Sequence, residues 1–296
     1  LGFQKLNAGF EQLVLAKDHI QLNIEALNFQ ERSGFTVQEL NSAIQVTEQS
    51  ADISGLKLRT SKSVISLDLQ GQYDNLTSLP AQLEDLQFDL DLSKAELAIA
   101  DLQMLVPSFR DSLPSMLSDT SQLAIKAKVN GKVGDFEIGQ FALNFAADTR
   151  LNLQGEVAGL PEFETMHFDL TSSLSTTSND MSHILPGSAS QSINLPGNID
   201  LQATSAGYID DFQSTLEFRS SQGNVLADVT LRNVRATNPK YDGKIDFEQY
   251  DLGVLLNDTA TFGTTTAQVT GSGEGFNMNA VQAKVDLLLE HLEFKG

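Results

Sequence analysis

The sequence predicts an all-β protein built around an antiparallel sheet, and three observations support this. Apolar residues recur at every second position along most of the 296 residues, which is the period of a strand with one apolar face. Turn signals such as Asn130-Gly131 and Asp242-Gly243 separate these runs. Runs and turns alternate every ten to twelve residues or so, which leaves no room for the helical crossovers of an α/β enzyme.

The strands with the clearest alternation follow one another along the chain. Their apolar positions are Ile65, Leu67, Leu69 and Tyr73; Phe88, Leu90 and Leu92; Phe141, Leu143 and Phe145; Leu151, Leu153 and Val157; Ile199, Leu201 and Ala203; Leu216 and Phe218; Val229 and Leu231; Ile245 and Phe247; Val285, Leu287 and Leu289. The positions between them are mostly polar, for example Ser66, Asp89 and Asp246. This alternation is typical of an antiparallel sheet with one dry face and one wet face.

Two segments have helical spacing instead. Residues 101–118 place apolar side chains three and four positions apart, which predicts an amphipathic helix interrupted by Pro107 and Pro114. A second short helix is predicted near the start, on Phe3, Leu6, Phe10, Leu13 and Val14.

The sequence also repeats itself weakly. Phe88, Phe168 and Phe247 each lie in a strand that follows a loop, and they are 80 and 79 residues apart. The strands before the first two also align, LDLQGQYDNL at 67–76 with LNLQGEVAGL at 151–160. A repeat of several strands and one optional helix predicts a continuous array rather than two compact domains. The approximate units are 1–80, 81–160, 161–240 and 241–296.

Composition excludes several classes of function. The sequence has 19 Lys and Arg residues and 39 Asp and Glu residues, which gives a net charge of −20. Because binding to phosphates needs a basic surface, a nucleic-acid partner is not expected. Without Cys the chain has no disulfide and no thiolate metal site. The sequence contains no stretch of about 18 apolar residues, which is the length needed to cross a membrane as a helix. Because the chain begins at Leu1 without a signal-peptide pattern, we expect it to be a piece of a longer protein.

No group of residues predicts catalysis, a metal site or a cofactor. The histidines are scattered, without paired metal-ligand spacing: His19, His167, His183 and His291. Asp89 and Asp91 fall on the wet face of a strand, as a solvated acidic stripe. Gly271, Gly273 and Gly275 lack the following helix that a phosphate-binding loop needs, so they predict a turn or bulge. An enzyme acting on envelope glycans or lipids is therefore the least favoured hypothesis.

The apolar face needs a cover or a ligand, because large exposed apolar patches are unusual on soluble proteins. A second sheet could close a β-sandwich, giving a structural or adhesive array without a ligand. Alternatively, one sheet could curl into a trough that accepts acyl chains. The residues predicted to line such a lipid groove are Leu67, Leu69, Phe88, Leu90, Phe141, Leu143, Phe145, Leu153, Phe168, Leu216, Phe218, Leu231, Phe247, Leu287 and Leu289.

Residues 22–76 resemble the repeat unit of the TamB and AsmA-like family of bacterial envelope proteins. The resemblance lies in an alternating strand that ends at Ser33-Gly34-Phe35, two further strands, and LKLRTSKSVISLD before a strand ending in Gly. The segment FDLDLSKAELAIADLQMLVP is similar to the next repeats, so the resemblance covers nearly the whole chain.

The resemblance implies an elongated, curved sheet forming a β-taco groove. It also implies transfer of phospholipid or another acyl-chain lipid between the inner and outer membranes, with a link to outer-membrane protein assembly. The implied location is the periplasm, in a protein whose inner-membrane anchor lies outside these residues. The implied partners are neighbouring repeats of the same longer chain and an outer-membrane barrel protein.

Overall fold

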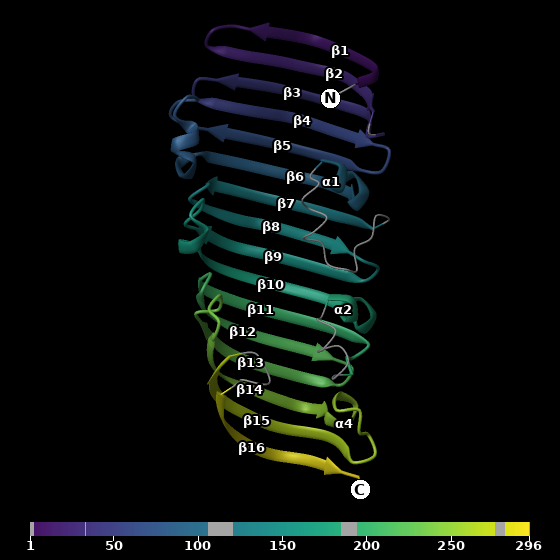
Figure 1. Ribbon diagram of the computed structural model, residues 1–296, viewed down its shortest axis with the longest axis vertical. Helices are drawn as coiled ribbons and strands as arrows, with labels where there is room; N and C mark the ends of the chain where they lie inside the picture. The colour runs from purple at the N-terminus through teal and green to yellow at the C-terminus, as the bar shows by residue number, and fades with distance from the viewer. Residues whose placement is uncertain (1–2, 33, 106–120, 185–193, 276–281, 296) are drawn as a thin grey trace. The chain divides into compact units, whose positions relative to one another are not determined.

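The computed structural model describes residues 3–32, 34–105, 121–184, 194–275 and 282–295, which are mostly β-strands (Figure 1). The strands are β1 Phe3–Leu15, β2 His19–Glu31, β3 Thr36–Thr47, β4 Ser50–Thr60, β5 Val64–Gln72, β6 Gln87–Ala98, β7 Gln122–Lys132, β8 Asp135–Phe145, β9 Thr149–Ala158, β10 His167–Thr177, β11 Asn198–Tyr208, β12 Asp211–Ser220, β13 Gly223–Arg232, β14 Lys240–Asp251, β15 Phe262–Glu274 and β16 Gln282–Phe294. The short helices are α1 Ile99–Leu105, α2 Ser178–Ile184 and α4 Leu252–Leu255, with 3-10 turns η1 Leu79–Ala81, η2 Leu83–Asp85 and η4 Phe163–Thr165.

All sixteen strands belong to one antiparallel sheet, in which they follow one another in chain order from β1 to β16. The predicted all-β class with a few short helices is therefore confirmed. The alternative, a β-sandwich, is wrong for the described residues, since no second sheet packs on the first. Each strand therefore pairs with the strand before it, also where a longer connection with a short helix lies between them, as between β6 and β7.

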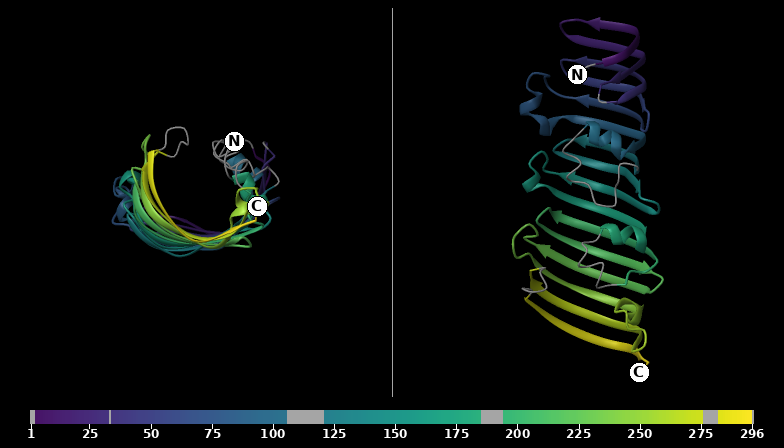
Figure 2. Two further views of the ribbon diagram at one scale, coloured as in Figure 1. Left: turned by 90° about the horizontal axis from the view of Figure 1, so that it is seen from below. Right: turned by 45° about the vertical axis from the view of Figure 1, so that its right-hand side comes forward.

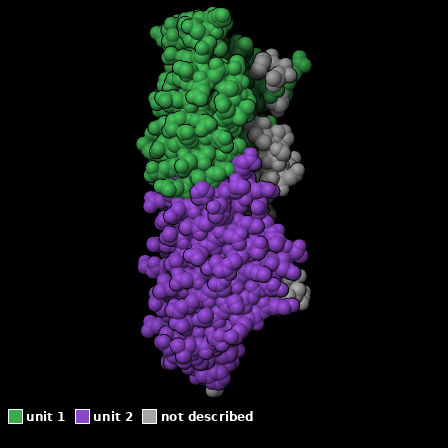
Figure 3. Space-filling view, turned by 90° about the vertical axis from the view of Figure 1, so that its left-hand side faces the viewer, with its two compact units in different colours: residues 1–146, 156–161 green, residues 147–155, 162–296 purple. Residues whose placement is uncertain are grey.

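The chain divides into two compact units (Figure 3). The first contains residues 1–146 and 156–161, and the second contains 147–155 and 162–296. Along the chain, from β6 on, every fourth strand runs into a short helix: β6 into α1, β10 into α2 and β14 into α4. The predicted boundaries of the 80-residue repeats remain a prediction.

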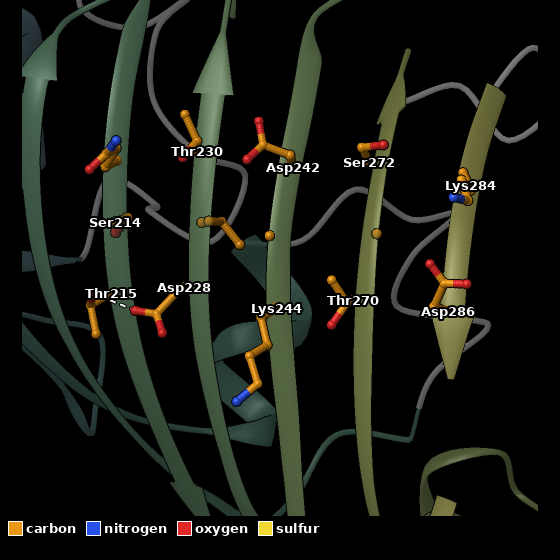
Figure 4. A pocket seen from close by; sticks show the side chains of 14 residues that line it. Ser214, Thr215, Asp228, Thr230, Asp242, Lys244, Thr270, Ser272, Lys284 and Asp286 are labelled. Atoms are coloured by element: carbon orange, nitrogen blue, oxygen red, sulfur yellow. Dashed lines mark hydrogen bonds between the residues drawn. The ribbon is translucent and has the colours of Figure 1, made fainter. Parts of the chain in front are cut away.

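The strands are bowed, and the short helices lie on the inner side of the bow (Figure 2). In the second unit the two faces differ in chemistry. Figure 4 looks at β12 to β16 from the outer side, which carries polar and charged side chains such as Asp228, Asp242 and Lys244. Because successive side chains of a strand point to opposite faces, the apolar residues between them lie on the inner face.

The N-terminal residues form strand β1, so the short helix predicted there is wrong. The register between β1 and β2 shifts at three places, between Gln4 and Asn7, Gly9 and Phe10, and Phe10 and Gln12. Each bulge adds a residue to one strand and breaks the two-residue period. The bulges therefore space the apolar residues of β1 three or four positions apart, as in a helix. The segment is nevertheless a strand, in which Phe10, Leu13 and Leu15 pair with Ile24, Leu22 and Ile20 of β2.

The structure also differs from the predictions for the helix at 101–118 and for several glycines. The helix predicted at 101–118 begins earlier, as α1, and its later part with Pro107 and Pro114 lies outside the described residues. Gly243 lies within β14 and Gly271 and Gly273 lie within β15, so these glycines mark neither turns nor bulges. Gly243 and Gly271 pair with each other across β14 and β15, and Gly273 pairs with Tyr241.

A buried aspartate in each of the helices α1 and α2 holds that helix in place through hydrogen bonds. Asp101 of α1 is 5% exposed, and its Oδ2 accepts hydrogen bonds from Thr60 Oγ1 at 2.5 Å and Ser63 Oγ at 2.7 Å. Asp180 of α2 is 4% exposed, and its Oδ2 accepts from Thr149 Oγ1 at 2.8 Å and from the backbone N–H of Asp148 at 3.0 Å. Each carboxylate thus ties a helix to a neighbouring hairpin end.

Candidate functional site: the apolar face

The apolar face is a single layer that remains largely accessible. The chain exposes 17844 Å², whereas a monomeric protein of 32.1 kDa is expected to expose roughly 12,000 Å². Of the fifteen residues predicted to line a groove, thirteen are partly exposed, and Leu287 and Leu289 on edge strand β16 are exposed. Large apolar side chains on this face therefore lack the complete cover of a closed core.

Strand pairing in the first unit groups the apolar residues into rows that run across the strands. The aromatic row is Gly71, Phe88, Gly131 and Phe136. The floor row beside it is Leu69, Leu90, Val129 and Ile138. Phe141 pairs with Ala127 and Leu143 with Ile125, which adds two further positions to the same face. A register shift that leaves Gly139 unpaired lets even-numbered Ile138 and odd-numbered Phe141 share this face.

The second unit contains corresponding rows. The aromatic row is Phe168, Gly207, Phe212, Leu231 and Tyr241. The floor row is Leu170, Ser205, Ser214, Val229, Gly243, Gly271 and Val285. Two more rows are Leu216, Ala227, Ile245, Val269 and Leu287, and Phe218, Val225, Phe247, Ala267 and Leu289.

The predicted lining residues thus fall into two sets. Those of the second unit that strand pairing places on one face are Phe168, Leu216, Phe218, Leu231, Phe247, Leu287 and Leu289. Those of the first unit are Leu67, Leu69, Phe88, Leu90, Phe141, Leu143 and Phe145, of which Leu67 and Phe145 follow from alternation within β5 and β8. Leu153 lies on the less exposed side of β9.

Two phenylalanine rings meet over a glycine in each aromatic row. The ring centroids of Phe88 and Phe136 are 5.8 Å apart, with Gly131 on the strand between them. Phe168 and Phe212 are 5.7 Å apart around Gly207. Both distances are typical of favourable tilted aromatic pairs. A glycine opposite each ring leaves room for it, so the rings lie along one margin of the apolar face.

An apolar hollow lies on the inner face of β13 to β16. Its volume is about 390 Å³, and the floor-row glycines Gly243 and Gly271 are among the residues that line it. The side chains around it include Val229, Leu231, Tyr241, Ile245, Val269 and Val285. Because the two glycines have no side chains, the floor is lower there than in neighbouring rows. Ser205 and Ser214 are further small residues of the floor row, on the other side of Val229, and their hydroxyl oxygens are 2.6 Å apart.

Sequence reasoning missed the floor row of the second unit. Ser205, Ser214 and Gly271 are small or polar, so a search for large apolar residues passes over them. The alignment of Phe136 with Phe212, 76 residues later, could have found two of them, since it places Ser205 at the position of Val129 and Ser214 at that of Ile138.

The outer face carries paired charges. Lys128 Nζ lies 2.9 Å from Asp91 Oδ2, and this hydrogen bond is the main cause that raises the pKa of Lys128. Asp246 accepts from Lys244 and from Gln268, which lower the pKa of its carboxyl. These exposed pairs keep one face of the sheet hydrated and add little to stability.

A polar hollow of about 580 Å³ lies on this outer face of the second unit (Figure 4). Thr215 donates to Asp228 across its floor at 2.8 Å, and Arg232 pairs with Asp242 at its edge. The hollow is lined by hydroxyls and by charges of both signs, such as Lys244 and Asp286. This mixture is typical of a solvated cross-strand ladder.

The described residues contain no group of three His, Asp or Glu side chains that could hold a metal ion. His167 stacks against Tyr208 with ring centroids 5.6 Å apart, and His19 hydrogen-bonds the neighbouring Asp18. No helix in the described part of the chain has the length and apolar character needed to span a membrane.

Comparison with models of known protein families, with curated protein sequences and with solved structures finds no match to this chain.

Proposed function

We propose that the inner face binds acyl-chain lipid, such as phospholipid, and that the protein transfers lipid between the inner and outer membranes of a bacterial envelope without catalysing a reaction. The observation that carries this proposal is the broad, single-layer apolar face with a low apolar floor at Gly243 and Gly271. The resemblance to the TamB and AsmA-like family supports the periplasm as the location and outer-membrane protein assembly as a linked process.

The dimensions of the low floor suit one acyl chain. From Ser205 in β11 to Gly271 in β15 the floor row crosses four strand spacings, or about 19 Å at about 4.8 Å each. One leaflet of a bilayer has a hydrocarbon depth of about 15 Å. Aliphatic rows on one side and the aromatic row on the other would contact such a chain along its length.

The energetics favour transfer along a face of this kind. Burying a 16-carbon chain at about 0.8 kcal/mol per CH₂ is worth roughly 12 kcal/mol, which is close to the cost of exposing that chain to water. Successive strands present similar apolar side chains along each row, so a lipid that moves along the row exchanges equivalent contacts. Each step then has a small free-energy barrier, and the acyl chain never crosses open water.

Photocrosslinking with matched positions tests the proposal. A photoreactive phenylalanine derivative replaces Val269 on the inner face or Thr270, the next residue of the same strand, on the outer face. Leu143 and Asn144 provide the same pair in the first unit. After incubation with phosphatidylethanolamine vesicles, we expect lipid adducts at Val269 and Leu143 and background levels at Thr270 and Asn144. Equal labelling of both faces, or none at the inner positions, contradicts the proposal.

A charged substitution separates lipid binding from a ligand-free structural array. Leu143 is only partly buried, so Leu143→Asp should leave the chain folded and reduce its crosslinked and co-extracted lipid. In a ligand-free array whose apolar face is ordinary core, the same substitution unfolds the protein. Circular dichroism and mass spectrometry of extracted lipid distinguish these outcomes.

A further inference from the structure

Two serines interrupt the floor row in the interior of the second unit. Ser205 of β11 and Ser214 of β12 lie opposite each other, and their further neighbours in the row are the apolar residues Leu170 and Val229. The corresponding positions of the first unit are apolar, although its strands pair in the same way. The fold therefore does not require a pair of hydroxyls at this place.

The two hydroxyls leave one proton without an acceptor. Their oxygens are 2.6 Å apart, and within the described residues the hydroxyl of each serine has the other as its hydrogen-bond partner. Each hydroxyl carries one proton, but a single hydrogen bond between the two uses only one of them. The second proton is therefore free to be donated to another acceptor.

Burial decides which serine keeps the free proton. Ser214 is 7% exposed, whereas Ser205 is partly exposed. If Ser205 donated to Ser214, the proton of Ser214 would be buried without an acceptor, which costs free energy. With Ser214 as the donor this cost is avoided, and the Ser205 hydroxyl has a proton to donate on the accessible apolar face.

The surroundings of Ser205 suit a neutral acceptor that is attached to an alkyl chain. From β11 to β15 the rows on either side of the floor row contain no charged residue, so an anionic group would have no cation beside it. A carbonyl oxygen accepts a hydrogen bond without carrying a charge. In a phospholipid, the ester carbonyl is the polar group that lies next to the acyl chain.

The floor row has room for the chain of such an ester. Ser205 and Gly271 are four strand spacings apart, or about 19 Å. The apolar hollow of about 390 Å³ lies toward Gly271 and is lined by Val229 and Gly243 as well. A chain whose ester meets Ser205 would pass over Val229 and end in this hollow.

We propose that Ser205 donates a hydrogen bond to the ester carbonyl of a bound lipid, so that the second unit selects acyl esters over lipids without this carbonyl. Ser214 is a positioning residue, because the hydrogen bond that it donates leaves the proton of Ser205 available. This inference rests on the proposed lipid binding, and it identifies the chemical class of lipid that the second unit prefers.

Two lysophosphatidylcholines that differ only in the carbonyl test the proposal. One has a palmitoyl ester and the other a hexadecyl ether. The photoreactive phenylalanine derivative at Val269 reports on the second unit, and the same residue at Leu143 reports on the first. At Val269 the ester lipid should reach half-maximal labelling at an about fivefold lower concentration than the ether lipid, or roughly 1 kcal/mol for one hydrogen bond. At Leu143 the two lipids should label equally.

The outcomes separate this inference from the proposed function. Equal half-maximal concentrations at Val269 overturn the selection of esters and leave lipid binding intact. An ester preference of the same size at Leu143 also overturns it, because the first unit has no hydroxyl at these positions. Absence of labelling by both lipids at both positions overturns the proposed function as well.

Alanine variants assign the selection to one hydroxyl. In the Val269 background, Ser205→Ala should abolish the difference between ester and ether, whereas Ser214→Ala should reduce it only in part because the Ser205 hydroxyl remains. Thr204→Ala removes an exposed hydroxyl from the outer face of the same strand and should leave the difference unchanged. An undiminished difference in Ser205→Ala overturns the role of Ser205. Circular dichroism checks that each variant is folded, and the comparison of lipids on the chain with both serines does not depend on these variants.

Discussion

The two units share an aromatic row and differ in the floor row beside it. Phe88 and Phe136 meet over Gly131 in the first unit, just as Phe168 and Phe212 meet over Gly207 in the second. Two of the neighbouring floor positions are large in the first unit and small in the second, whereas a third is leucine in both. The pairs that correspond are Leu90 with Leu170, Val129 with Ser205, and Ile138 with Ser214.

This difference separates residues that the backbone of the sheet requires from residues that only shape the surface of its apolar face. The glycine between two rings is required by the backbone, because there is no space for a Cβ. At Gly243 of the floor row a Cβ would also lie too close to Asp228 O. The positions of Val129 and Ser205 carry no such requirement, since a large and a small residue are both compatible with the fold there. The floor row is therefore where the two units can differ in what they bind.

The largest expected effect is on the shared glycines. At Gly131 a Cβ would lie 2.6 Å from Phe136 Cα, and at Gly207 it would lie 2.7 Å from Phe212 Cα. Both glycines also have positive φ, 135° and 140°. Gly131→Ala and Gly207→Ala should each lower the free energy of unfolding by about 2–4 kcal/mol, through backbone strain and displacement of the ring. Urea denaturation measures the loss.

Gly71→Ala is the matched control, because it lies in the same aromatic row as Gly131. A Cβ there would meet Ala51 O at 3.5 Å, which is ordinary contact. We expect a change below about 1 kcal/mol. If all three variants lose the same stability, the close approach is not what requires glycine at 131 and 207.

The next effect concerns the carboxylates that fasten α1 and α2. Asp101→Ala or Asp180→Ala leaves buried hydroxyl and N–H donors unpaired, which should cost about 2 kcal/mol in either unit. In each case a single oxygen, Oδ2, accepts both hydrogen bonds. Asn keeps one acceptor oxygen, so Asp→Asn should recover part of the loss. Exposed Asp200→Ala should change stability by less than about 0.5 kcal/mol, and a similar loss there would refute a specific fastening role.

The strands and their apolar faces were predictable because the two-residue period is local. The prediction failed where the period is broken by a bulge. In β1 the register shifts space Phe10 and Leu13 as a helix would. At Gly139 the same effect leaves β8 a strand but moves its apolar positions from even to odd numbers.

The floor row was not predictable, because a row is defined by pairing between strands far apart in sequence. Gly243 and Gly271 each resemble a turn signal when only their own neighbours are considered. They are opposite each other only once the register of β14 and β15 is known. The hollow that they create therefore has no signature in either segment alone.

Exchanging the floor residues sharpens the comparison between units. Ser205→Val together with Ser214→Ile gives the second unit the floor residues of the first. We expect the filled floor to weaken binding of a fluorescent fatty acid about tenfold, or roughly 1.4 kcal/mol. Thr204→Val with Gln213→Ile adds similar bulk to the outer face of the same strands and should leave binding unchanged. Equal weakening by both double variants would argue against the low floor as the binding element.

The smallest expected effect is a loss of stability at alkaline pH, and it involves one buried tyrosine in each unit. Burial, with Asp52 as a second cause, raises the pKa of Tyr73, and burial raises the pKa of Tyr250. A raised tyrosine pKa means that folding favours the neutral phenol. This stabilisation is complete below the unfolded pKa of about 10 and is lost as the pH rises through the folded pKa. Both units should therefore lose stability above about pH 10.

Phenylalanine substitutions separate the two tyrosines. Tyr73 Oη donates toward the carbonyls of Ser50 at 2.8 Å and Thr47 at 3.0 Å, whereas Tyr250 Oη is 3.4 Å from Gln222 Oε1. Tyr73→Phe should cost about 1 kcal/mol at pH 7, and Tyr250→Phe should cost less because its hydrogen bond is long. Each variant should also lose less stability between pH 9 and pH 11 than the unmodified chain, as measured by urea denaturation at each pH. An unchanged alkaline profile in both variants would assign the loss to other groups, because a phenylalanine has no proton to release.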